Sequence, residues 1–210
     1  MKQNNCIRRA FAAILATALL LGTGTFAFAE GDAATIHIKT AEDLLTLSEN
    51  CTLDTWSQGK TIELDADISL EGTEFKPIPS FGGTFNGNGR TISGLNIGGK
   101  VSSAGLFRTI QKGGVVRSLN VSCVINAPNS EAVGGIAAVN NGTIQGCSFA
   151  GNINGSSMTG GIAGINGLSG SILSCRSTGA VYGTSMTGGI AGENLGLISA
   201  STNNAYVNTS

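Results

Sequence analysis

The chain has 210 residues, a formal net charge of −1 at pH 7 and a mean hydropathy of +0.19; 12% of its residues are charged and 32 are glycine. Residues 82–196 hold 27 of those glycines, which excludes helices of ordinary length there because glycine destabilises a helix interior. A near-neutral chain without aromatic residues interleaved among its bases also does not fit nucleic-acid binding.

The first 29 residues have the three parts of a secretory signal peptide. A basic start carries Lys2, Arg8 and Arg9, an apolar run covers residues 10–21, and Ala27-Phe28-Ala29 supplies the small residues of a cleavage site. The apolar run is too short for a membrane span, and we find no other segment that could cross a bilayer. We therefore expect export with cleavage after residue 29, and a mature protein that is secreted or held at the cell surface.

Residues 30–75 form an acidic opening, with eleven acids and two bases, a balance of −9. Residues 36–39 alternate apolar and polar side chains, which is typical of a strand. Thr40 can then cap a short helix because Asp43 stands at its third position, in a capping box. We expect this amphipathic helix to cover the apolar end of the structure that follows, and Ile62 and Leu64 to begin its first rung.

Residues 76–210 contain a glycine-rich sequence repeat. The eight letters SMTGGIAG at residues 157–164 recur unchanged at residues 185–192. The Gly-Gly-Ile unit begins at Gly134, Gly160 and Gly188, which are offsets of 26 and 28 residues. A period in this range is typical of a solenoid, in which copies of one unit stack along an axis.

The repeat units share further columns of equivalent residues. An asparagine, an isoleucine and a small residue recur in successive units: Asn140, Asn166 and Asn194; Ile144, Ile172 and Ile198; Cys147, Cys175 and Ser201. We expect the asparagines to form a hydrogen-bonded ladder at a corner and the isoleucines to pile up inside. One rung upstream, we match Val116, Leu119, Val121 and Ile125 to Ile144, Cys147, Phe149 and Ile153. One rung earlier still, we match Ile92, Leu95 and Ile97 to Val116, Leu119 and Val121.

These columns predict the fold class. Short alternating runs broken by Gly and Asn indicate strands, and a stack of such units around a narrow apolar interior is an all-β, single-stranded parallel β-helix. We expect five to six rungs of three strands each. A right-handed coil is expected because right-handed crossovers dominate parallel strand connections. The sequence stops inside a repeat, so we also expect further C-terminal repeats or domains.

Four cysteines follow the cleavage site, and two of them, Cys147 and Cys175, share a column. In an exported chain they could form a disulfide between rungs, since stacked Cα atoms about 4.8 Å apart lie within the range that a disulfide accepts. Parallel side-chain directions argue against that bond and favour buried free thiols. The absence of a Cys-x-x-Cys pair and of a nearby histidine argues against a metal site, and we expect no cofactor.

Residues that could carry catalysis are few. From residue 76 onward the only acids are Glu131 and Glu193, in different repeat slots, and the sole histidine, His37, is expected to point outward. A β-helix lyase or hydrolase needs paired carboxylates or a neighbouring base. Asp65 and Asp67 alternate along one strand face, either as a conceivable acid pair or as ordinary polar residues of that strand.

Aromatic and basic side chains offer limited signs of a ligand. The residues that could stack on sugar rings are Trp56, Tyr182 and Tyr206, which we place in unrelated slots. Six bases cluster before residue 118: Lys76, Arg90, Lys100, Arg108, Lys112 and Arg117. They could form a strip that binds an anionic polymer, but solvated outer positions are the favoured interpretation.

Residues 81–97, with the letters FGGTFNGNGRTISGLNI, then Ala104-Gly105-Leu106-Phe107 and the Gly-Gly-Ile-Ala-Gly units resemble the GLUG-motif β-helix family of bacterial surface and secreted proteins. The resemblance covers about residues 40–210 and implies the same fold. The family includes large adhesin-like molecules and proteins related to immunoglobulin A-specific metallopeptidases, and most members lack assigned chemistry. This chain has no His-Glu-x-x-His, so the resemblance implies a repeat region without a peptidase centre.

Together these observations predict a non-catalytic, exported β-helix module of a bacterial surface protein. It would act as a rigid stalk or an adhesive surface, with a glycan or a host or cell-wall polymer as its candidate partner. Two alternatives stay open. One is a fragment of a carbohydrate-active enzyme of the pectin lyase type, and the other is the accessory repeat region of a surface metallopeptidase.

Overall fold

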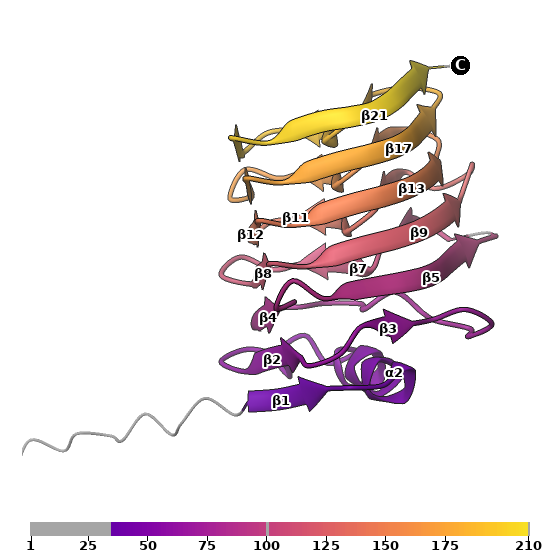
Figure 1. Cartoon of the computed structure of the whole chain (residues 1–210). Coiled ribbons are helices and arrows are strands. Elements are labelled where there is room, and N and C mark those ends of the chain that lie inside the picture. The colour runs from indigo at the N-terminus through magenta and orange to yellow at the C-terminus, as the bar shows by residue number, and fades with distance from the viewer. Residues whose placement is uncertain (1–34, 100, 210) are drawn as a thin grey trace, which may run out of the picture. The chain divides into compact units, whose positions relative to one another are not determined.

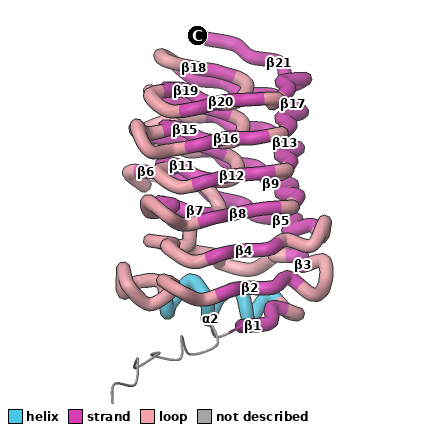
Figure 2. Tube along the Cα trace, turned by 90° about the vertical axis from the view of Figure 1, so that its left-hand side faces the viewer, coloured by secondary structure: helices cyan, strands magenta, loops and turns pink. Residues whose placement is uncertain are grey.

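The computed structural model describes residues 35–99 and 101–209, which form one parallel β-helix. The chain rises from its indigo to its yellow end, and in each turn the strand at the front runs from left to right (Figure 1). A coil that rises in this way is right-handed, and the side view agrees (Figure 2). The predicted fold class is therefore confirmed, whereas the predicted signal peptide, residues 1–29, lies outside the described residues.

Four sheets run along the coil, and every pairing between the named strands is parallel. The sheet that faces the reader in Figure 2 has seven strands. In order these are β1 (Thr35–Ile38), β2 (Thr61–Leu64), β4 (Thr84–Asn86), β8 (Val115–Arg117), β12 (Thr143–Gln145), β16 (Ser171–Leu173) and β20 (Leu197–Ser199).

The sheet at the front of Figure 1, which we call the front sheet, contains the longest strands. Its six strands are β3 (Ile68–Ser69), β5 (Thr91–Gly98), β9 (Asn120–Asn126), β13 (Ser148–Asn154), β17 (Arg176–Gly183) and β21 (Thr202–Thr209). Two four-stranded sheets complete the coil. They consist of β6 (Ser103–Ala104), β10 (Ala132–Gly134), β14 (Met158–Gly160) and β18 (Thr187–Gly188), and of β7 (Phe107–Ile110), β11 (Ala137–Asn140), β15 (Ala163–Asn166) and β19 (Ala191–Asn194).

The stack starts one rung earlier than the sequence analysis placed it. Ile36 and Ile38 of β1 lie opposite Ile62 and Leu64 of β2, so the rung at residues 61–64 is the second and not the first. The strand predicted at residues 36–39 is thus itself part of the stack. The front sheet has six strands, which agrees with the expected five to six rungs, and β1 adds a seventh strand to the longest sheet.

The register predicted between the rung at residues 92–97 and the rung at residues 116–121 was wrong. Ile92 lies opposite Val121, and the partner of Val116 is Phe85. Residues 84–86 and 91–98 belong to the same turn but to two successive sheets. The match failed because an alternating run fits either of two neighbouring parallel strands equally well when no glycine pair marks the corner between them.

The interior of the coil is a continuous apolar core. Ile144, Ile172 and Ile198 lie opposite one another in β12, β16 and β20, and the first two are fully buried while the third is partly buried. Nearer the N-terminal end, the rings of Phe81 and Phe107 lie 5.2 Å apart between centroids. Stacked apolar columns of this kind give each turn the same interior, so the turns hold one another in register.

Three asparagines form a ladder at one corner of the coil, where β11, β15 and β19 end. Nδ2 of Asn140 donates to Oδ1 of Asn166 at 2.8 Å, and Nδ2 of Asn166 donates to Oδ1 of Asn194 at 2.8 Å. Asn140 and Asn166 are fully buried. Each amide bonds to the next, so the ladder provides hydrogen-bond partners for polar groups at a buried corner. Without partners, their burial would be unfavourable.

The helix α2 (Ala41–Asn50) lies at the N-terminal end of the coil (Figure 1) and buries Leu44 and Leu47 in the core. Its start has the predicted capping box: Oγ1 of Thr40 accepts from the Asp43 N–H at 3.1 Å, and Oδ2 of Asp43 accepts from the Thr40 N–H at 3.0 Å. Oδ2 of Asp43 also accepts from the Lys39 N–H at 2.9 Å. Hydrogen bonds from the Lys39 backbone and from Thr40 hold the pKa of the Asp43 carboxyl below its ordinary value.

Replacing Thr40 with alanine is expected to lower the free energy of unfolding by about 1 kcal/mol at pH 7, because the first turn of α2 loses a backbone partner. The ionised Asp43 carboxyl also stabilises the folded protein. This stabilisation is fully present above the unfolded pKa of about 4 and is lost as the pH falls through the lower pKa of the folded protein. Urea unfolding at pH 7 and pH 3 measures both effects. Thr46→Ala, at an exposed position of the same helix, is the control; an equal loss there would contradict the capping role.

Candidate functional site

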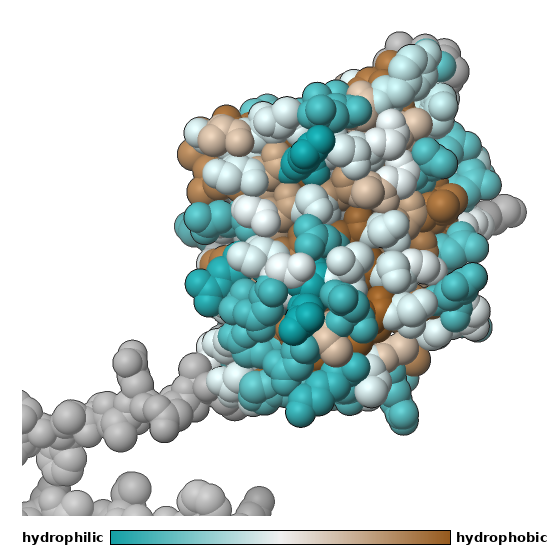
Figure 3. All heavy atoms as spheres, viewed as in Figure 1, coloured by the Kyte–Doolittle hydropathy of each residue, from teal (hydrophilic) through white to brown (hydrophobic). Residues whose placement is uncertain are grey.

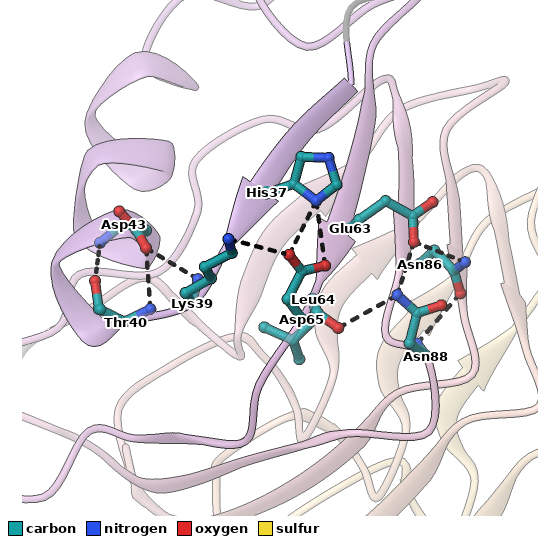
Figure 4. Close-up of polar contacts among 9 residues, drawn as sticks. All are labelled: His37, Lys39, Thr40, Asp43, Glu63, Leu64, Asp65, Asn86 and Asn88. Carbon is teal, nitrogen blue, oxygen red and sulfur yellow. Dashed lines mark hydrogen bonds and ion pairs between the residues drawn. The ribbon is translucent and has the colours of Figure 1, made fainter.

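Two carboxylates of the acidic opening, Glu63 and Asp65, connect neighbouring turns (Figure 4). Asp65, just after β2, meets Nδ1 of His37 at 3.0 Å and Nζ of Lys39 at 3.9 Å, both from the preceding turn. Oε2 of Glu63 accepts from Nδ2 of Asn86 at 3.0 Å and from Nδ2 of Asn88 at 2.7 Å, both from the following turn. These contacts, which are exposed or half-buried, connect the first three turns to one another.

Asp65 and Asp67, the conceivable acid pair, serve two different neighbours. Asp65 contacts His37 in the turn below, whereas Oδ1 of Asp67 accepts from the Thr91 N–H in the turn above at 2.7 Å. Neither residue lies within a strand, because β2 ends at Leu64 and β3 begins at Ile68, so the predicted shared strand face is wrong. Glycoside hydrolysis by a carboxyl pair needs both groups directed at one substrate bond, and this arrangement directs them to opposite neighbours.

The basic residues before position 118 are spread over different sides of the coil. Arg108 lies on β7 and Arg117 on β8, which belong to different sheets, and Arg90 precedes β5 at the edge of the front sheet. All three are exposed. These three bases therefore occupy solvated outer positions on different sides of the coil and do not line a single strip, whereas Lys100 lies outside the described residues.

The four cysteines of the described region, Cys51, Cys123, Cys147 and Cys175, are free and buried. Burial raises the pKa of the Cys51 thiol to about 11 and that of the Cys123 thiol to about 12. The contact with Cys175, together with burial, raises the pKa of the Cys147 thiol. Sγ of Cys147 lies 3.3 Å from the Gln145 carbonyl oxygen, and Sγ of Cys175 lies 3.3 Å from the Leu173 carbonyl oxygen.

We expect iodoacetamide at pH 8 to leave Cys51 and Cys123 unmodified in the folded protein, because the reactive thiolate is scarce when the pKa is raised and the sulfur is buried. In urea, a chain beginning at residue 30 should take up four adducts, counted by intact mass spectrometry. Two adducts in urea without reductant, and four with it, would show the Cys147–Cys175 disulfide instead. Rapid labelling of Cys123 in the folded protein would contradict its burial.

Metal ligands and membrane spans are not evident in the part of the chain that the structure describes. Within it, no three or more His, Cys, Asp or Glu side chains gather as a metal site would require. The helix of this region is also too short to be a membrane-crossing segment.

A hollow of about 620 Å³ beside α2 is lined in part by Glu49, Glu74 and Lys76 and carries no aromatic side chain.

The outer face of the front sheet gathers a different set of side chains. Asn126, Asn154, Tyr182 and Asn208 lie opposite one another in β9, β13, β17 and β21. Beside them runs a second outward column: Val124, Asn152, Ala180 and Tyr206. Together they make a surface that we call the amide–tyrosine face.

The two tyrosines of this face contact each other, so their assignment to unrelated slots was wrong. Their ring centroids are 6.1 Å apart with an angle of 55° between the planes, and Tyr182 is 40% exposed while Tyr206 is 62% exposed. Tyr206 lies opposite Ala180, two residues before Tyr182. Residues two apart on a strand share a face, so neighbouring strands can bring together side chains from adjacent columns.

A shallow groove of about 580 Å³ borders Tyr182 on the amide–tyrosine face. Its outward lining consists of Val124, Asn126, Asn152, Asn154 and Tyr182. Nδ2 of Asn154 donates to Oδ1 of Asn126 at 3.0 Å, which orients the two amides. The face thus combines two amides held by a hydrogen bond with a neighbouring pair of exposed aromatic rings.

Comparisons with known proteins show similarities in sequence and in fold. No family model matches the chain. A stretch of 137 residues, 60% of this chain, is 31% identical to halomucin of Haloquadratum walsbyi, and the match spans 2% of that protein. The fold is similar to the crystal structure of a Bacteroides ovatus protein assigned as an immunoglobulin A1 protease, with a TM-score of 0.56 and 19% identity over 81% of this chain and 66% of that one. The chain therefore spans less than two thirds of either protein, and the structural likeness concerns the fold alone.

Proposed function

We propose that this chain is a non-catalytic β-helix module of an exported surface protein, in which it serves as a rigid stalk that presents its outer faces. The observation that carries the proposal is the unbroken parallel register from β9 to β21, which repeats the same inward columns over four turns. Stacked turns that share one core resist bending and unfold together, as a spacer requires. The partial match to halomucin supports a place in a long surface protein.

Export and family membership form part of the same proposal. The basic, apolar and small-residue segments of residues 1–29 support a cleaved signal peptide. The glycine-rich units from residue 81 onward support membership of the GLUG-motif family and a bacterial source. Expression of the whole chain in a Gram-positive secretion host should release a protein whose N-terminal residue is Glu30, identified by mass spectrometry. Retention of residues 1–29 in the released protein would contradict the signal peptide.

The absence of catalysis is tested by incubating the purified chain with neutral and acidic polysaccharides. We expect no new reducing ends and no unsaturated products, because Glu63, Asp65 and Asp67 are engaged in contacts between turns. Turnover that Asp65→Asn or Asp67→Asn abolishes would overturn the proposal in favour of a carbohydrate-active enzyme. Glu131→Gln is the matched control, since its carboxylate lies on another part of the coil.

A further inference from the structure

The amide–tyrosine face has the chemistry of a surface that recognises sugars. Primary amides offer two N–H donors and a carbonyl acceptor each, which match the hydroxyl groups of a sugar. Exposed aromatic rings offer flat apolar surfaces that stack on the C–H faces of a pyranose ring. Tyr182 and Tyr206 supply two such rings side by side, and Asn126, Asn154 and Asn208 supply the amides.

The near absence of charge on this face favours neutral over anionic carbohydrates. Of all residues in β5, β9, β13, β17 and β21, only Arg176 is charged, and it lies at the opposite end of β17 from Tyr182. Figure 3, in the same view as Figure 1, shows polar and apolar residues intermixed over the front of the coil. An anionic polymer would find no cluster of bases here, whereas a neutral polymer loses no ionic hydration when it binds.

The spacing of the face favours an extended ligand. Neighbouring strands of a sheet lie about 4.8 Å apart, so equivalent side chains repeat along the coil axis at that interval. This interval is comparable to the length of one sugar unit in a straight polysaccharide. The column from Asn126 to Asn208 crosses four strands, and the groove of about 580 Å³ lies along the first three of them.

We propose that the amide–tyrosine face binds a neutral, extended polysaccharide of the β-1,4-linked kind, laid along the coil axis with a sugar ring stacked on Tyr182 and Tyr206. This proposal rests on the module being non-catalytic and surface-exposed, and it names the ligand class that such a module would hold. The hydrogen bond between Asn126 and Asn154 prepares two of the amides before the ligand arrives, which reduces the ordering cost of binding.

Isothermal titration calorimetry with cellohexaose, chitohexaose and hexagalacturonate tests the proposal on the chain from residue 30. We expect at least one of the two neutral hexasaccharides to bind and the anionic one not to bind. Tyr182→Ala and Tyr206→Ala should each weaken that binding about tenfold, and Tyr182→Phe should keep it within about threefold because the ring remains. Leu168→Ala is the matched control, because it removes an 85% exposed apolar side chain from a loop on another side.

Binding of neither neutral hexasaccharide would overturn the proposal, as would equal binding of hexagalacturonate or binding that both tyrosine variants leave unchanged. Circular dichroism of each variant establishes that the coil is intact, and exposed tyrosines are not expected to be needed for folding. The same samples are assayed for new reducing ends. Turnover would overturn the non-catalytic function while leaving the binding face in place, so the two failures are distinguishable.

Discussion

Replacement of Gly160 by alanine is expected to destabilise the coil by about 4 kcal/mol or more. Gly160 ends β14, where the coil turns into the next strand. A Cβ atom there would lie 2.7 Å from the Ala191 Cα and 2.7 Å from the Gly192 nitrogen, and closer still to the Ala163 carbonyl oxygen. All three are backbone atoms, and two belong to the next turn, so relief requires the turns to separate.

The cost should depend on whether a further turn packs over the glycine. Gly188 follows Gly160 in the same column, and a Cβ there would meet atoms of Ala191 in its own turn alone. Gly188→Ala is therefore expected to cost less than Gly160→Ala. Gly98→Ala is the control, because its nearest neighbour would be the Asn126 carbonyl oxygen at an ordinary 3.7 Å, and we expect a change within about 0.5 kcal/mol.

Urea unfolding followed by circular dichroism measures the three variants against the parent chain from residue 30. If Gly160→Ala fails to fold, the graded pair Gly188→Ala and Gly98→Ala still tests the argument. Equal stability of Gly160→Ala and Gly98→Ala would contradict it, because that result would mean that the turns are not in close backbone contact at this corner.

The same close contacts explain why so much of the architecture could be predicted from the sequence. At Gly134 and Gly160 a Cβ atom would meet backbone atoms of the next turn, so the stacked corners require glycine there and the period becomes visible. Asn140 and Asn166 recur because an amide can bond to its own copy one turn away. Where both kinds of marker are present, from residue 134 onward, the predicted asparagine and isoleucine columns coincide with the observed strand pairs.

The first turns were harder to predict because they lack these markers. Phe85 and Val116 share a column although their side chains differ in size and shape. Alternation alone could not distinguish the strand at residues 84–86 from that at residues 91–98. The structure resolves the ambiguity because the corner between them fixes which sheet each strand joins.

The candidate binding face escaped the sequence analysis for a different reason. Tyr182 and Tyr206 are 24 positions apart, whereas their strands are offset by 26, so they do not share a column. A search for equal columns therefore separates them. A residue and the partner of the position two residues away on the adjacent strand still point to the same face of the sheet. A search for such diagonal pairs would have found the contact between the two tyrosines.

The buried asparagine ladder provides the second large effect. Asn166→Asp keeps the size of the side chain but replaces an amide that donates to Oδ1 of Asn194 at 2.8 Å and to the Leu197 carbonyl oxygen at 3.2 Å. The new carboxyl group would face these acceptors inside a fully buried corner. We expect the free energy of unfolding to fall by about 3 kcal/mol or more at pH 7, because lost donors and a desolvated charge both disfavour the folded state.

The pH dependence identifies the cause of that loss. Burial among oxygen acceptors disfavours the ionised form, so the introduced carboxyl should have a folded pKa above its unfolded value of about 4. The deficit relative to the parent chain should then be smallest below pH 4 and should grow as the pH rises toward the folded pKa. Asn194→Asp, at the exposed end of the same ladder, is the control and should cost less than about 1 kcal/mol. Urea unfolding across this pH range measures the free energy of unfolding of both variants. If Asn166→Asp loses little stability, or loses the same amount at every pH, the ladder does not depend on a buried chain of neutral amides.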